Sequence, residues 1–239
     1  MANRVFTDEE LCEMGTSTVT LLTEAIEQGE KSKATELVNR LYKEFEFMHD
    51  LYVDWTAAFM DHIYCSQGAD ALHDVLRKVI GIPPRASNSD QQANHKSQDS
   101  IAVFRNQVNY LASVLRGHLQ SIRIEEDDEK VCMVMEPCGS GQRLMECGSY
   151  RPPRNLTMIQ EPHIITWGMK NFPIYCTHAP MLEILSIEQL GYPTTVIFPA
   201  NEVATESCRY CVYKNKDDIP NEVYERIGKK KPNTETGAQ

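Results

Sequence analysis

The sequence contains no run of about 18 apolar residues, the length that a membrane-spanning helix requires. It also lacks a basic excess, because 24 lysines and arginines stand against 34 aspartates and glutamates and give a formal charge of −10. A general nucleic-acid binder needs a basic surface. The composition therefore predicts a protein that binds neither a membrane nor a nucleic acid.

An apolar signal core is missing from the acidic first fifteen residues, MANRVFTDEELCEMG. We therefore expect a cytoplasmic protein, in which thiols stay reduced. Under this expectation the eight cysteines need an explanation other than disulfides. Metal binding or thiol chemistry is the natural interpretation for those in the second half of the chain, which are Cys132, Cys138, Cys147, Cys176, Cys208 and Cys211.

The first third of the chain has the pattern of helices. Thr7 and Glu10 form a capping box, which predicts a helix start. A longer helix follows, in which apolar residues recur every three or four positions. They predict one buried stripe, serving as a core or as a dimer seam: Leu37, Leu41, Phe45, Met48, Tyr52, Trp55, Phe59 and Ile63. Gly68 ends this pattern, and a third helix is predicted to end at Gly81.

The period of the pattern changes after a polar stretch and a fourth helix that begins near residue 101. Residues 120–138 alternate around an acidic turn and predict a β-hairpin, residues 139–173 predict a long ordered loop, and a helix closed by Gly191 precedes two more strands. The predicted class is α+β: an N-terminal helical bundle segment followed by a domain with a small antiparallel sheet. The predicted divisions are a helical segment at 1–82, a polar linker at 83–100, the α+β domain at 101–225 and a polar tail at 226–239.

The stretch EPCGSGQR follows a predicted strand. Backbone N–H groups at Gly139, Ser140 and Gly141 can converge on an anion, and Arg143 can pair with a carboxylate or phosphate. The stretch lacks the Lys-Ser/Thr of a nucleotide-binding loop and the third glycine of a dinucleotide fingerprint, which excludes both. Cys138 has three interpretations: a nucleophile, a metal ligand or a half-buried residue of a tight turn.

The next part of the chain adds histidines and aromatic residues. His163 and His178 are the candidate bases for Cys138. Trp167 and Tyr175 are expected either to line a small-molecule pocket or to form an ordinary core wall.

Four residues near the end of the chain predict a metal site. Cys176, His178, Cys208 and Cys211 carry thiolate and imidazole groups, which are ligands of zinc and are equally compatible with iron. Because Cys208 and Cys211 are three residues apart, a regular strand would point them to opposite faces. Either the backbone near Arg209 is irregular, or only one of the pair is a ligand. The alternative is that these cysteines are inert and buried.

The segments PIYCTHAP, MLEILSIEQLGYPTTVIF and ESCRYCVYK resemble the end of the V4R (4-vinyl-reductase-type) small-molecule-binding domains. The resemblance covers about residues 120–215, and it implies that cysteines and a glutamate bind zinc beside a ligand pocket. In this chain Glu202, Glu206 or His178 would complete the ligand set. The family's acidic residue followed by cysteine, upstream of the last cysteine, is absent here.

A second metal pattern lies in the long helix, where Glu46 and His49 stand three residues apart, as in di-iron bundles. A di-metal bundle needs a second such motif and two more inward glutamates, which the sequence does not contain. We interpret these residues, with Asp50, Asp54 and Asp61, as a solvated acidic face.

These patterns favour a metal-assisted enzyme of the hydrolase or lyase type. It would act on a small anionic or aromatic metabolite, with zinc as the cofactor. Cys138 or His163 would attack the substrate or transfer protons. The alternative is a non-catalytic sensor or carrier of a small molecule, with a structural zinc. In either case the helical segment is expected to form a homo-oligomer.

Overall fold

The structure is a computed structural model, and it describes residues 5–81, 100–118, 120–204 and 206–232. The chain divides into two compact units, residues 1–52 and residues 53–239. This division lies thirty residues before the predicted boundary at residue 82. Of the predicted linker at 83–100, only Ser100 is described, as the first residue of a helix.

Unit 1 consists of helices only. It contains α1 (Asp8–Gly15), α2 (Thr18–Glu27) and the first part of α3 (Lys31–Ile80). The predicted capping box is confirmed, because Thr7 accepts a hydrogen bond from the Glu10 backbone and Glu10 accepts one from the Thr7 backbone. The Ser17 hydroxyl caps α2 by accepting a hydrogen bond from the Thr20 backbone N–H.

Helix α3 crosses the division between the two units and continues to Ile80. Its backbone leaves the helical region at Gly68, where φ is 86°, as the glycine in the pattern predicted. Within one chain the predicted stripe is exposed over much of its length, so it does not form a continuous core of this chain. Phe45, Trp55 and Phe59 have exposed fractions of 49%, 53% and 68%, whereas Ala57 and Met60 are buried.

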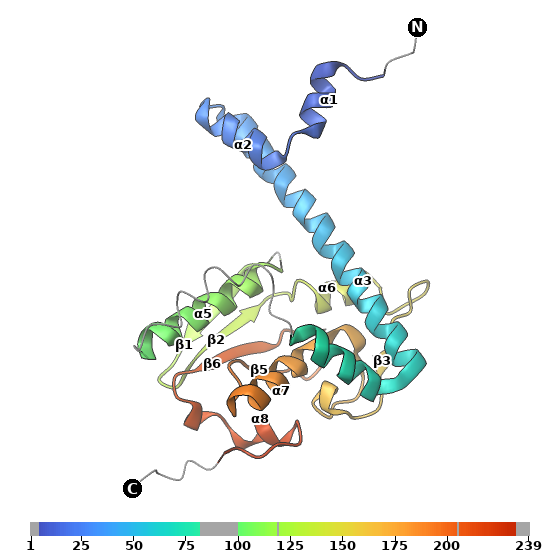
Figure 1. Cartoon of the computed structure of the whole chain (residues 1–239), viewed down its shortest axis with the longest axis vertical. Coiled ribbons are helices and arrows are strands. Elements are labelled where there is room, and N and C mark those ends of the chain that lie inside the picture. Colours follow the sequence, from blue (N-terminus) through green and yellow to red (C-terminus); the bar gives the residue numbers. More distant parts are fainter. Residues whose placement is uncertain (1–4, 82–99, 119, 205, 233–239) are drawn as a thin grey trace. The chain divides into compact units, whose positions relative to one another are not determined.

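Unit 2 is built around a four-stranded antiparallel sheet in the order β1-β2-β6-β5 (Figure 1). Its strands are β1 (Ile122–Glu126), β2 (Lys130–Met135), β5 (Val196–Phe198) and β6 (Arg209–Tyr213). The predicted hairpin is confirmed, with Ile124 opposite Met133. The α+β class predicted from the sequence is therefore confirmed.

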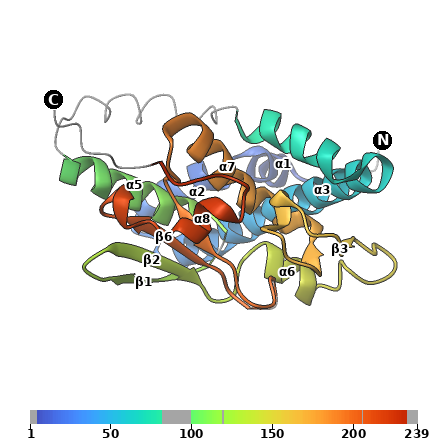
Figure 2. The ribbon, with the colours of Figure 1, turned by 90° about the horizontal axis from the view of Figure 1, so that it is seen from below.

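Helices pack against this sheet (Figures 1 and 2). Helix α5 (Ser100–Arg116) contacts β1 and β2, and α7 (His178–Leu190) contacts β5. Ala112 and Leu115 of α5 pack against Val131, Met133 and Met135, which alternate along β2 and so share one face of the sheet. Gly191 ends α7 in the left-handed conformation at φ 81°, as predicted.

The segment predicted as a long loop contains short elements. They are α6 (Gly141–Glu146), β3 (Met158–Ile159), η2 (Ile164–Thr166) and β4 (Phe172–Pro173), and β3 pairs with β4. The short helix η3 (Ile174–Thr177) follows directly. After β6 the chain forms η4 (Lys216–Asp218) and α8 (Asn221–Glu225). A larger core joins the second part of α3, this segment, α7 and α8.

The carboxylates of α3 in unit 2 hold this segment in place. Asp54 forms a two-pronged ion pair with Arg154, in which Arg154 Nη2 lies 2.6 Å from Asp54 Oδ2. Asp61 accepts a hydrogen bond of 2.7 Å from the Thr157 backbone. These two residues are therefore bound to protein groups and do not belong to a purely solvated acidic face.

Candidate functional site

Eight of the predicted site residues line one cavity in unit 2. The turn after β2 and the start of α6 supply Cys138, Ser140 and Gly141, and the end of η2 supplies Trp167. Tyr175 and Cys176 belong to η3, His178 begins α7, and Cys208 precedes β6. Glu206, which the resemblance to V4R domains named as a possible ligand, also lines the cavity. The polar lining residues that sequence reasoning did not assign to the site are His118 and Tyr210. Tyr210 stands two residues after Cys208. Because residues i and i+2 of a strand point to the same face, the sequence could have predicted that both face the cavity.

Glycines bring the walls of this cavity together. A Cβ atom on Gly141 would lie 2.8 Å from Cys176 Sγ, and one on Gly139 would lie 1.8 Å from the carbonyl oxygen of His118. Both distances are shorter than a carbon atom tolerates. Gly139, predicted as an anion-binding residue, is thus required for the close approach of two backbone segments.

The cavity has a volume of about 40 Å³. This is room for an ion or a water molecule, which needs roughly 10–15 Å³ or more. Pockets for metabolites measure about 300–1,000 Å³. Trp167 and Tyr175 line this small space and also belong to the buried core of unit 2.

Burial controls the ionisation of the cavity's thiols. It raises the pKa of the Cys176 thiol, and the neighbouring Cys138 and Cys208 raise that pKa further. Burial also raises the pKa of Cys208. Among the described residues that line the cavity there is no lysine or arginine to stabilise a thiolate. An apo protein at neutral pH thus holds Cys176 and Cys208 as neutral thiols.

His178 is neutral as well, because burial lowers its pKa. Its Nδ1 lies 2.6 Å from the Tyr175 carbonyl oxygen, which can only accept a hydrogen bond. Nδ1 therefore carries the proton, and Nε2 keeps a lone pair. Burial also raises the pKa of Tyr175 to about 12, so its phenol stays protonated.

Besides Gly139, three predicted site residues do not line the cavity. Cys211 is bonded to Cys132, so the prediction that it is a metal ligand is wrong in this structure, as is the expectation that all thiols are reduced. His163 accepts a hydrogen bond from the Ile165 backbone at Nδ1 and contacts Asp70 at Nε2, so it caps η2 and does not line the cavity. Arg143 belongs to α6 and is not among the lining residues.

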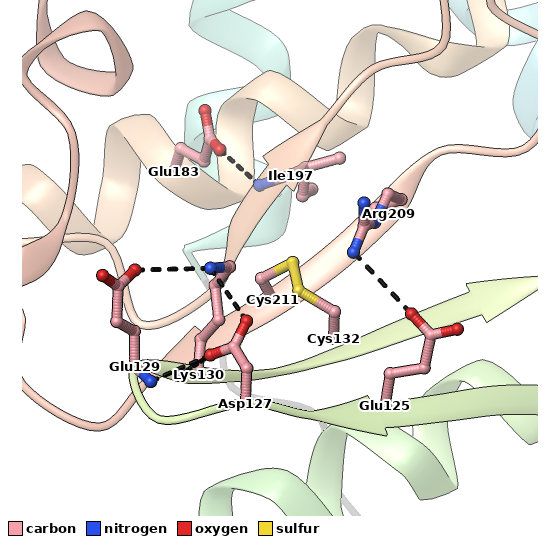
Figure 3. The surroundings of a disulfide bond; sticks show 9 residues. All are labelled: Glu125, Asp127, Glu129, Lys130, Cys132, Glu183, Ile197, Arg209 and Cys211. Atoms are coloured by element: carbon pink, nitrogen blue, oxygen red, sulfur yellow. Dashed lines mark hydrogen bonds and ion pairs between the residues drawn. A yellow bond between two sulfur atoms is a disulfide. The ribbon is translucent and has the colours of Figure 1, made fainter.

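The Cys132–Cys211 bond links opposite residues of β2 and β6, as Figure 3 shows. It lies on the sheet face opposite to Met133 and Met135, because side chains alternate along a strand. The side chains of Cys208 and Cys211 therefore point to opposite faces, as their three-residue spacing predicted, and of the two only Cys208 lines the cavity.

Within the described ranges, no three His, Cys, Asp or Glu side chains are arranged to hold a metal ion as they stand. The described helices also include none that is both long and apolar enough to cross a membrane. Comparison of the chain with protein-family models, with curated proteins and with solved structures gives no match.

Substituting Gly141 with alanine tests the close contact at Cys176. The added methyl group would displace the sulfur, and we expect a loss of about 1–3 kcal/mol in the free energy of unfolding. Urea titration measures this. Gly15→Ala is the matched control, because a Cβ atom there meets nothing within 4 Å. An equal effect of the two substitutions would contradict the described packing.

Proposed function

We propose that the cavity is the metal site of a metal-assisted enzyme of the hydrolase or lyase type, with zinc bound by Cys138, Cys176 and Cys208. The observation that supports this is the convergence of three thiols from distant segments on one cavity of ionic size. Soft thiolate ligands favour zinc, and iron is compatible with them.

Three protein ligands leave a fourth position of a tetrahedral zinc ion open, which is the arrangement of catalytic zinc sites. Zinc at such a position polarises a carbonyl group or lowers the pKa of bound water. His178, with its lone pair at Nε2, is one group in the cavity that can take a proton, alongside His118 and Glu206, and we assign it this role in place of His163. Because the cavity is about 40 Å³, the substrate must be small or must enter by displacing side chains.

A second candidate is a non-catalytic small-molecule sensor or carrier with a structural zinc. The small volume of the cavity favours it, because His178 can act as the fourth ligand and close the site. This candidate also accommodates the resemblance to V4R domains, which remains a proposal. Under both candidates we place the protein in the cytoplasm.

Zinc content after purification and dialysis tests the metal site. We expect about one zinc ion per chain for the wild type, and an affinity at least about tenfold weaker for Cys176→Ser. Cys147→Ser is the matched control, because Cys147 is an exposed thiol outside the cavity. A wild type without bound zinc, or Cys176→Ser binding zinc as the wild type does, would overturn the proposal.

Cobalt substitution separates the two candidates. The visible spectrum of a cobalt ion held by thiolates responds to a change in its ligands. If a position is open, added azide changes the spectrum of the wild type and of His178→Ala alike. If His178 closes the site, only His178→Ala responds, and the protein is the non-catalytic one.

A further inference from the structure

Unit 1 exposes more apolar side chain than it buries. Among its described residues only Thr18, Ala25 and Leu37 are buried. The large apolar side chains that it exposes are Val5, Phe6, Leu11, Met14, Val19, Ile26, Val38, Tyr42, Phe45, Phe47, Met48 and Tyr52. Together they present on the order of 1,000 Å² of apolar surface.

Part of this surface follows a regular row on α3, which we call the apolar row: Val38, Leu41, Phe45, Met48 and Tyr52. Its members are separated by alternating steps of three and four residues. This spacing has a period of 3.5 residues, which places them at the a and d positions of a heptad repeat. Val38, Phe45 and Met48 have exposed fractions of 52%, 49% and 38%.

We infer that a second copy of this chain covers the apolar row, so that the protein is a homodimer joined through unit 1. A heptad row packs best on a helix with the same spacing, and a second copy supplies an identical one.

The charges of unit 1 permit this approach. Lys33 pairs with Glu30 and Arg40 pairs with Glu44, each within one copy. The apolar row itself contains no charged residue, so two copies meet without bringing like charges into contact.

Segments of the same chain that lie outside the described residues are poor candidates for the covering partner. Residues 82–99 read IPPRASNSDQQANHKSQD and residues 233–239 read NTETGAQ. Their composition is polar, and Ile82 is the one large aliphatic side chain among them. Such sequences bury too little apolar surface to cover the row.

Sedimentation equilibrium of the full chain tests the inference, with a reductant present so that the exposed Cys12 cannot cross-link two copies. We expect a dimer for the wild type. Phe45→Glu places a charge in the seam and should weaken the dimer about a hundredfold or more. Phe45→Ala removes only apolar contact and should weaken it about tenfold.

Phe47→Glu is the matched control. Phe47 lies on the same helix with an exposed fraction of 67%, but it falls outside the heptad row, so its substitution should leave the dimer intact. Circular dichroism establishes that each variant keeps its helices. A monomeric wild type, a Phe45→Glu variant that stays as dimeric as the wild type, or dissociation by Phe47→Glu would each overturn the inference. Zinc content is measured on the same samples, and it is expected to be unchanged.

Discussion

Replacing Arg226 with methionine is expected to cost about 3–5 kcal/mol of unfolding free energy at pH 8, because it leaves a buried carboxylate without its counter-charge. The carboxylate is Glu183 of α7, which has no exposed surface. It accepts hydrogen bonds from Trp167 Nε1 at 2.8 Å and from the Ile197 backbone at 2.7 Å, and it pairs with Arg226.

The cost should depend on pH, and its sign follows from the pKa of Glu183. Burial raises this pKa, while Arg226 and the two N–H donors oppose the shift. Removing Arg226 raises it further. An acid with a raised folded-state pKa loses stability as the pH rises through that value. The variant should therefore lose less stability at pH 5 than at pH 8.

Urea unfolding at the two pH values measures this effect. The double variant Glu183→Gln, Arg226→Met provides the comparison, because it removes the charge and its partner together. We expect it to be more stable than Arg226→Met alone at pH 8. A loss below about 1 kcal/mol for Arg226→Met, or a loss independent of pH, would show that the pair is not buried as described.

This network also fixes one wall of the cavity. Arg226 lies over the Trp167 ring, with its Cζ 5.0 Å from the ring centroid, and it donates a hydrogen bond of 2.8 Å to the Ile197 carbonyl. Trp167 thus connects the cavity to α7, β5 and the end of α8. The sequence separates these residues so widely that no local pattern indicated their contact.

The second large effect is expected from the bond between Cys132 and Cys211. The two residues are 79 positions apart. Chain-entropy arguments give about 4 kcal/mol of stabilisation for a closed loop of this length. Cys132→Ala, Cys211→Ala should lower the free energy of unfolding by about that amount under oxidising conditions.

Thiol counting and reduction test the bond directly. The denatured, unreduced protein should present six reactive thiols of its eight cysteines. Dithiothreitol should destabilise the wild type and leave the double variant unchanged, both measured without metal. Eight reactive thiols, or a wild type insensitive to the reductant, would contradict the bond.

The sequence predicted the elements whose signals are local. Thr7 and Glu10 marked a helix start, Gly191 marked a helix end, and the alternation on either side of residue 127 marked the hairpin. These signals depend on neighbours within about four residues along the chain or across a turn. They were sufficient for the α+β class.

The candidate site was predicted only in part, because some of its contacts depend on residues that are distant in sequence. Cysteine content indicated the thiol cluster, and the period of a strand separated Cys208 from Cys211. The pairing of Cys211 with Cys132 depends on the register of two strands that are distant in sequence. The same helical spacing describes a buried stripe and an exposed seam, so periodicity could not tell that Phe45 is exposed.

The strand register has a consequence for how the protein is made. Synthesis proceeds from the N-terminus, so Cys132 leaves the ribosome first among the cysteines of the sheet and the cavity. Cys138, Cys176 and Cys208 all follow before Cys211, its partner in the finished sheet, becomes available. During synthesis, Cys132 can therefore pair with any of these cysteines before Cys211 is available. A reductant present during synthesis would keep Cys132 unpaired until β6 is available.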